Sequence, residues 1–126
     1  MSPEQIVAWL NRLVKAGVSA ATLEEQAPEL VEALCGQDES QTALESAIAA
    51  EVFIARAIDR LGGDLGESMS IFLGMKPGLR RTSVDFRQTA AGQALGNISA
   101  DAFRQKRHRE SYMKDLGVEI YKLINN

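Results

Sequence analysis

Residues 40–61, SQTALESAIAAEVFIARAIDRL, constrain the fold more than any other part of the sequence. This stretch is the longest uninterrupted helical pattern in the chain, since it contains neither glycine nor proline. Successive residues of a helix are about 100° apart, and at that angle the side chains separate into an apolar face and a charged face. We therefore expect this segment to be the central core helix. The apolar face consists of Leu44, Ala47, Ile54, Ala57, Ile58 and Leu61, and the charged face of Glu45, Arg56, Asp59 and Arg60.

Glu51 is the one residue that disagrees with this separation, because it falls within the apolar arc. Two interpretations are open. A carboxylate at the edge of the arc, or one paired with an arginine from another helix, needs no function. A buried acid can instead belong to a functional site.

Capping signals predict a first helix at the N-terminus. Ser2, Pro3 and Gln5 follow one another as an N-cap, a favoured first-turn proline and a capping-box partner. Gly17 stands where a helix ends. The apolar stripe of this helix consists of Ile6, Leu10, Leu13 and Val14.

The next segment repeats the capping pattern and then meets a proline. Thr22 and Glu25 have the spacing of a capping box. Pro28 cannot lie inside a regular helix, so we expect one helical turn at 22–26. A new helix is predicted from Pro28 to Cys35, closed by the glycine that follows.

Glycines and a proline divide the second half of the chain. GGDLG, residues 62–66, interrupts the pattern, and a short apolar helix is predicted from about Glu67 to Leu73. GMKPGLRRT, residues 74–82, is a turn-rich connector, either a loop or a short β-hairpin wing. Ser83 is predicted to cap a helix over 84–95. The buried side of that helix is expected to consist of Val84, Ala91, Ala94 and Leu95.

The C-terminal segment carries an apolar stripe that conflicts with the residues before it. Extended backwards by helical steps, the stripe reaches Gln105, Lys106 and Arg109, and burying those cations would be costly. Either the helix breaks near Arg109 to Ser111, or its N-terminal half projects from the body. We favour a break, with Glu110 or Ser111 capping a separate C-terminal helix. The stripe consists of Met113, Leu116, Ile120, Leu123 and Ile124, with Tyr112 at its edge.

These features predict an all-α fold, a compact bundle of about six helices in a single domain, residues 1–126. Hydrophobic residues make up 45% of the chain and charged residues 25%, as in ordinary globular domains. The most apolar segment contains Glu51 and Arg56 and cannot span a bilayer. The basic portion lacks an apolar opposite face of its own, so we expect no contact with membranes. One cysteine and no signal-peptide pattern at the start favour a cytoplasmic protein.

The net charge of −3 hides a strong difference between the two halves. Residues 1–75 contain four Lys or Arg and twelve Asp or Glu, net −8, whereas residues 76–126 contain ten and five, net +5. Such asymmetry is informative about binding partners. We expect residues 1–75 to form an acidic helical scaffold or oligomerisation surface and residues 76–126 to form a basic unit.

The sequence VDFRQTAAGQALGNISADAFRQKRHRE, residues 84–110, contains a helix of small residues, a glycine turn and a second capped helix. It resembles the helix-turn-helix of bacterial DNA-binding proteins. In one respect it departs from that motif, because Asn97 lengthens the turn by one residue. The resemblance implies a helix-turn-helix-like C-terminal half, similar to that of a transcriptional regulator, whose helix 100–109 docks in the major groove. The matching positions are Gly92, where the two helices approach closely, Gly96, Ile98, Ser99 and Phe103.

The candidate binding residues follow from this interpretation. Arg104 and Arg107 lie one helical turn apart, close to the positions that touch base edges, and Gln105 is suited to adenine. The other cations suit phosphate contacts, and Ser99 would lie at the N-terminus of the helix, where anions bind. The predicted DNA-binding residues are Arg80, Arg81, Ser99, Arg104, Gln105, Lys106, Arg107, His108 and Arg109.

Other partners remain open, because a basic run on a helix is also typical of a solvated or ion-paired surface. The main alternative is a protein-interaction domain, an adaptor or the regulatory part of a larger bacterial system. Its partner would be an acidic protein or a second copy of the chain, with acidic and basic faces pairing between copies.

Enzymatic chemistry is not expected, and neither a metal nor a cofactor is predicted. The single histidine, His108, has no cysteine or second histidine at zinc-ligand spacing. Cys35 has no identifiable base and is predicted to be a core thiol. The larger aromatic side chains are expected in the core rather than in a ligand site: Trp9, Phe53, Phe72 and Phe86.

Overall fold

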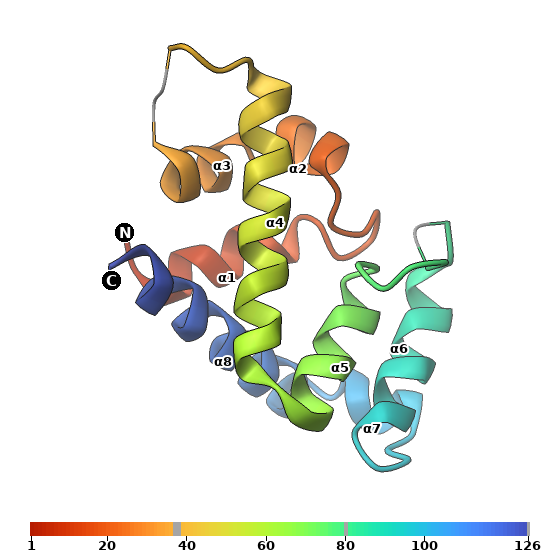
Figure 1. Ribbon diagram of the computed structural model, residues 1–126. Helices are drawn as coiled ribbons and strands as arrows, with labels where there is room; N and C mark the ends of the chain where they lie inside the picture. Colours follow the sequence, from red (N-terminus) through yellow and green to blue (C-terminus); the bar gives the residue numbers. More distant parts are fainter. Residues whose placement is uncertain (37–38, 80, 126) are drawn as a thin grey trace.

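The computed structural model of the protein describes residues 1–36, 39–79 and 81–125, and of residues 106–109 the backbone only. These residues form eight helices and no strand (Figure 1), which confirms the predicted all-α fold. About six helices were expected, and the larger number partly reflects a true helix at the turn predicted over 22–26. The helices are α1 (Pro3–Asn11), α2 (Ala20–Gln26), α3 (Pro28–Cys35), α4 (Ala43–Leu61), α5 (Gly63–Phe72), α6 (Val84–Ala94), α7 (Ala100–Arg104) and α8 (Lys106–Ile124).

Helix α4 is the central element, as the sequence predicts. It packs against α2 and α3 near its N-terminal end and against α5 and α8 further along, and Figure 1 shows it crossing in front of α1 and α8. Leu44 is a correction, because it is 50% exposed rather than buried. It lies at the edge of the arc that the neighbouring helices cover. The fully covered side chains of α4 are Ala47, Ala50, Ile54 and Ala57, with Ile58 nearly so.

The N-terminal helices begin at short polar side chains. Ser2 caps α1 as predicted, with its Oγ accepting from the backbone N–H of Gln5 at 3.2 Å. The capping box of α2 is a correction, since it joins Ser19 and Thr22 rather than Thr22 and Glu25. Ser19 Oγ accepts from Thr22 N at 3.2 Å, and Ser19 N donates to Thr22 Oγ1 at 3.0 Å. A serine three residues earlier thus makes Thr22 the third residue of the helix instead of its cap.

Helices α5 and α6 flank the connector of residues 74–82. Helix α5 begins at Gly63, four residues before the predicted start, whereas Ser83 caps α6 as predicted and accepts from Phe86 N at 3.1 Å. The described part of the connector is a loop without strand. Phe86 is 55% exposed, so its assignment to the core was wrong. Phe72 is buried, and Trp9 and Phe53 pack partly buried against the core.

The buried side of α6 also differs from the prediction, because it contains a charged residue. Arg87 is 1% exposed, and its guanidinium donates to three backbone carbonyl oxygens. Nη1 donates to Phe72 O at 2.6 Å, and Nη2 donates to Val14 O at 2.8 Å and Lys15 O at 2.9 Å. These carbonyls end α5 and the turn after α1, where helix dipoles favour a cation. Burial lowers the pKa of Arg87. Val84, Ala94 and Leu95, expected to be buried, are only partly so.

Helix α8 closes the bundle and lies along α1 and α4. Its stripe is confirmed, since Met113, Leu116 and Ile120 are buried and the two apolar residues near its end are partly buried. Arg60 of α4 donates through Nε to Glu119 Oε1 at 2.9 Å and so ties α4 to α8. Figure 1 shows α1 and α8 packed against each other. None of the described helices has the length and apolar character needed to cross a membrane.

Candidate functional site

The turn between α6 and α7 has the close contact that its resemblance to a helix-turn-helix requires. A Cβ atom at Gly92 would clash with the carbonyl oxygen of Ile98, so only glycine fits there. Gly96 and Asn97 both have positive φ, 95° and 63°, and asparagine tolerates this conformation better than most residues. The two left-handed residues let Ile98 N donate back to Gly92 O at 2.9 Å. Asn97 is therefore accommodated as an extra residue of the turn.

The helix that follows this turn is much shorter than expected. Ser99 caps α7 as predicted and accepts from Ala102 N at 3.1 Å, but α7 ends at Arg104 after five residues. Gln105 is extended, with φ −54° and ψ 125°, and α8 begins directly after it. A continuous helix over 100–109 was therefore wrong, and the predicted break lies at Gln105 rather than near Arg109 to Ser111.

Core packing explains this position of the break. Phe103 on α7 and Met113 on α8 are both buried, and a change of direction between the two helices lets both face the core. Phe103 packs edge-on against Phe72, with ring centroids 5.1 Å apart. Its ring also stacks with Tyr112, with centroids 5.9 Å apart.

Arg104 contacts acidic and amide groups of its own half of the chain. Its Nε donates to Gln88 Oε1 at 2.7 Å, and its Nη2 lies 3.2 Å from Asp85 Oδ1. Asp101 on the same helix is a third neighbour, 3.7 Å from Nη1. This residue, expected to read base edges, is therefore held against α6, and the exposed Asp101 adds negative charge beside it.

The structure describes three of the other predicted DNA-binding residues in full. Arg81 is exposed and has no ion pair among the described residues, and Ser99 and Gln105 are exposed at the starts of α7 and α8. The contact of Arg104 with Asp85 places the end of α7 beside the first turn of α6, to which the connector carrying Arg81 leads. Arg80 and the side chains of Lys106, Arg107, His108 and Arg109 lie outside the described residues.

The outward side of α4 carries an apolar row that the sequence interpretation did not single out. Leu44, Ile48 and Val52 are 50%, 50% and 55% exposed. They are spaced four residues apart, so they follow one another on the same side of the helix. Leu44 had been assigned to the core and the other two to neither face. The sequence did contain a signal for this row. Apolar residues four positions apart lie on the same side of a helix, and this side faces away from Ile54.

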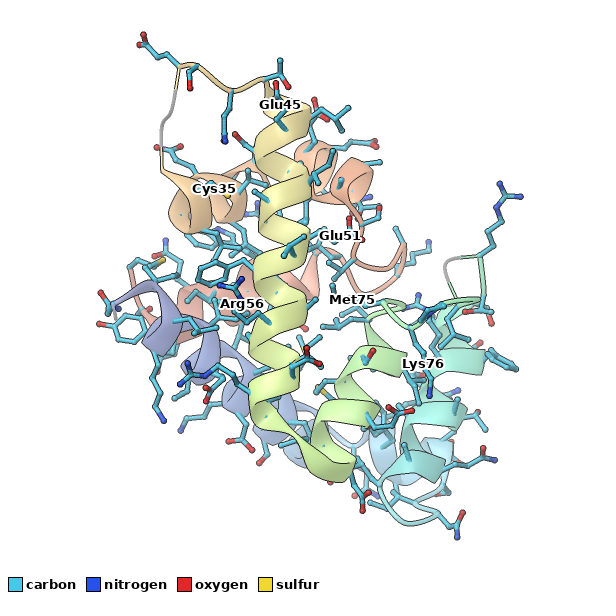
Figure 2. All side chains as sticks on the ribbon, viewed as in Figure 1. Cys35, Glu45, Glu51, Arg56, Met75 and Lys76 are labelled. Carbon is cyan, nitrogen blue, oxygen red and sulfur yellow. The ribbon has the colours of Figure 1, made fainter. Side chains whose placement is uncertain are left out.

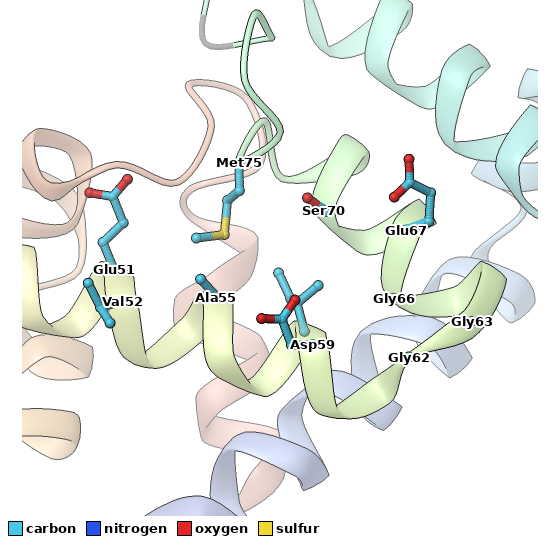
Figure 3. A pocket seen from close by; sticks show the side chains of 11 residues that line it. Glu51, Val52, Ala55, Asp59, Gly62, Gly63, Gly66, Glu67, Ser70 and Met75 are labelled. Carbon is cyan, nitrogen blue, oxygen red and sulfur yellow. The ribbon is translucent and has the colours of Figure 1, made fainter.

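A hollow of about 610 Å³ adjoins this row between α4 and α5 (Figure 3). Val52 belongs to both the row and the hollow. Figure 3 shows the Met75 side chain extending toward α4 between Glu51 and Ser70. The lining thus combines apolar groups of α4 and the connector with three carboxylates, those of Glu51, Asp59 and Glu67.

The three carboxylates have different surroundings. Glu51 is partly buried, and its Oε2 accepts from Ala20 N, in the first turn of α2, at 3.1 Å. This contact supports the interpretation of Glu51 as a structural carboxylate at the edge of the apolar arc. Glu67 pairs with Lys76, and both side chains are about half exposed. Lys76 and Glu51 are labelled in Figure 2. Asp59 is exposed and has no ion pair in the described part of the chain.

The remaining candidate groups offer little for catalysis. A second hollow, about 430 Å³, lies between α2, α3 and the start of α4 and is also lined by glutamates. Cys35 is partly buried beside it, and its Sγ donates to Ser46 O at 3.3 Å. Burial raises the pKa of the Cys35 thiol, which disfavours the reactive thiolate. Within the described residues, no three His, Cys, Asp or Glu side chains are grouped so as to hold a metal.

No protein-family model, curated protein sequence or solved structure matches this chain.

Proposed function

We propose that this protein is an interaction domain that binds an amphipathic helix of another protein along the outward side of α4. The observation that carries this proposal is the row of Leu44, Ile48 and Val52, half-exposed on the central helix α4. Single exposed aliphatic residues are ordinary, but a contiguous apolar surface next to a hollow is typical of a binding face.

The spacing of the row explains why a helix is the expected occupant. Residues four apart on a helix form a ridge, and two helices pack by placing such ridges in each other's grooves. Apolar positions at this spacing are also the pattern by which amphipathic helices are recognised. Covering the exposed area of three aliphatic side chains contributes about 25 cal/mol for each Å² removed from water.

A designed peptide tests this proposal directly. The probe is a fluorescent helical peptide with leucines at positions i, i+4, i+7 and i+11 and glutamines elsewhere, titrated with the protein and followed by anisotropy. We expect the Ile48→Asp variant to bind at least tenfold more weakly, since a buried carboxylate at the centre of the row would be unpaired.

Ala49→Asp is the matched control. Ala49 is the next residue of the same helix, is exposed and lies off the row, so the same new charge should change binding less than about twofold. Equal affinity of both variants for the peptide, or no binding to any of the three proteins, would contradict the proposal.

DNA binding is a second candidate, favoured by the turn between α6 and α7 and by the basic sequence that opens α8. The geometry at Gly92 agrees with the resemblance to a helix-turn-helix, and the contact between Arg104 and Asp85 brings the start of α8 toward the connector that carries Arg81. The short α7 means that base contacts would have to come from the first turn of α8. Phosphate contacts by exposed cations would make binding fall steeply with salt.

Duplex affinity at 50 and 200 mM salt separates this candidate from the first. We expect an Arg81→Ala, Arg107→Ala double variant to lose affinity and to reduce the salt dependence, while Arg56→Ala, on the outward side of α4, serves as control. Absence of measurable binding at 50 mM salt would end the DNA-binding proposal without affecting the first.

A further inference from the structure

We infer that the partner helix is basic, and that one of its lysine or arginine side chains enters the hollow between α4 and α5. This inference rests on the proposed function, because it names the chemistry of the helix that the α4 row would bind. Three properties of the surface support it: continuity of the row with the hollow, the carboxylates around the hollow, and the shape of the lining.

The row and the hollow form one continuous surface. Val52 is the last residue of the row and lines the hollow, and Ala55 and Asp59 continue along the same side of α4. A helix lying on Leu44, Ile48 and Val52 therefore passes the opening of the hollow. A side chain that projects from its flank at this point reaches the lining.

The charges around the hollow are mostly negative. Glu51, Asp59 and Glu67 line it, and its described lining residues include no lysine or arginine. Arg56 is an exposed cation on the opposite edge of the row. Lys76 pairs with Glu67 and compensates that carboxylate. Asp59, exposed and without an ion pair in the described residues, is the carboxylate best placed to meet a cation of the partner. Electrostatic complementarity of this kind mainly selects the partner.

The apolar part of the lining suits the stem of such a cation. Lysine and arginine place their methylene groups along apolar surface while the charged end stays near polar groups. Ala55 and Met75 supply this apolar surface next to Asp59. At about 610 Å³, the hollow has room for one such side chain.

A second copy of the chain is the alternative occupant of the same surface. If two α4 helices paired in antiparallel fashion about Ile48, Leu44 of each copy would come level with Val52 of the other. Glu45 and Glu51 would then lie on opposite edges of the contact, because they are about 120° apart around the helix, so they would neither favour nor oppose the pair. Figure 2 labels both glutamates on α4. Self-association is therefore an alternative outcome of the test below.

Three peptides test the inference. They have leucines at identical positions, and their flanking positions are all lysine in the first, all glutamine in the second and all glutamate in the third. We expect the lysine peptide to bind about tenfold more tightly than the glutamine peptide and the glutamate peptide to bind more weakly. Raising the salt from 50 to 500 mM should remove most of the lysine advantage. Asp59→Asn should weaken only the lysine peptide, by about fivefold, whereas the control Asp64→Asn, outside the lining, should not.

The outcomes separate this inference from the proposed function. If lysine and glutamine peptides bind equally and Asp59→Asn has no effect, the inference is overturned; the proposed function stands as long as Ile48→Asp still abolishes binding. If binding does not depend on Ile48 for any peptide, both are overturned. Concentration-dependent dimerisation that Ile48→Asp prevents, with no peptide bound, would assign the surface to a second copy and overturn the basic partner.

Discussion

The two sides of α4 carry the same kinds of side chain in opposite surroundings. Ile54 is fully buried, whereas Ile48, six residues earlier on the same helix, is half exposed. The difference comes from the neighbours, since α2, α3, α5 and α8 pack around α4 and leave its outward side uncovered. An isoleucine on a helix therefore stabilises the fold only where another element covers it, and elsewhere it is available to a partner.

The largest expected effect distinguishes these two isoleucines directly. Ile54→Ala should lower the free energy of unfolding by about 2–4 kcal/mol, because it leaves a cavity in the core. Ile48→Ala should lower it by less than about 0.5 kcal/mol, because the side chain already contacts water on one side. Urea denaturation of both variants measures the difference. Equal losses would show that the outward side of α4 is covered in the folded protein.

A smaller effect is expected at the border between the two sides, where Glu51 lies. Its carboxylate accepts from Ala20 N and lies at the N-terminus of α2, where a negative charge is favourable. Glu51→Gln should therefore lower the free energy of unfolding by about 1 kcal/mol. Hydrogen exchange at the Ala20 amide should become faster at the same time. Asp59→Asn is the control, since Asp59 is exposed and makes no such contact, and unchanged stability in both variants would contradict this role of Glu51.

Local signals in the sequence predicted the parts of the fold that depend on neighbouring residues. Ser2, Ser83 and Ser99 cap helices as predicted, because an N-cap bonds to an amide only three residues away. The break before α8 was also predicted, from the conflict between the apolar stripe and the cations. Its position was misjudged because the burial of Phe103, which depends on Phe72 of another helix, moves it to Gln105.

The sequence could not predict what depends on distant segments. Arg87 is buried because carbonyls of Val14, Lys15 and Phe72 converge on its guanidinium, and nothing near Arg87 in the chain indicates them. The exposure of the α4 row was unpredictable for the same reason. The spacing of its residues shows that they share one side of the helix, but it does not show whether another helix covers that side. The arrangement of the helices decides which side chains are buried, and the candidate site consists of apolar side chains that this arrangement leaves exposed.

The smallest expected effect concerns two arginines on the outer part of α4. Arg60 pairs with Glu119 of α8 at 2.9 Å, and since the arginine side chain is 48% exposed, solvent screens much of the attraction. Arg60→Ala should lower the free energy of unfolding by about 0.5 kcal/mol, and the loss should shrink as salt is raised. Arg56, exposed and without an ion pair among the described residues, should show no loss when changed to alanine. A larger effect at Arg56 than at Arg60 would mean that the outward side of α4 makes contacts within the folded chain, which would undermine its assignment as a free binding face.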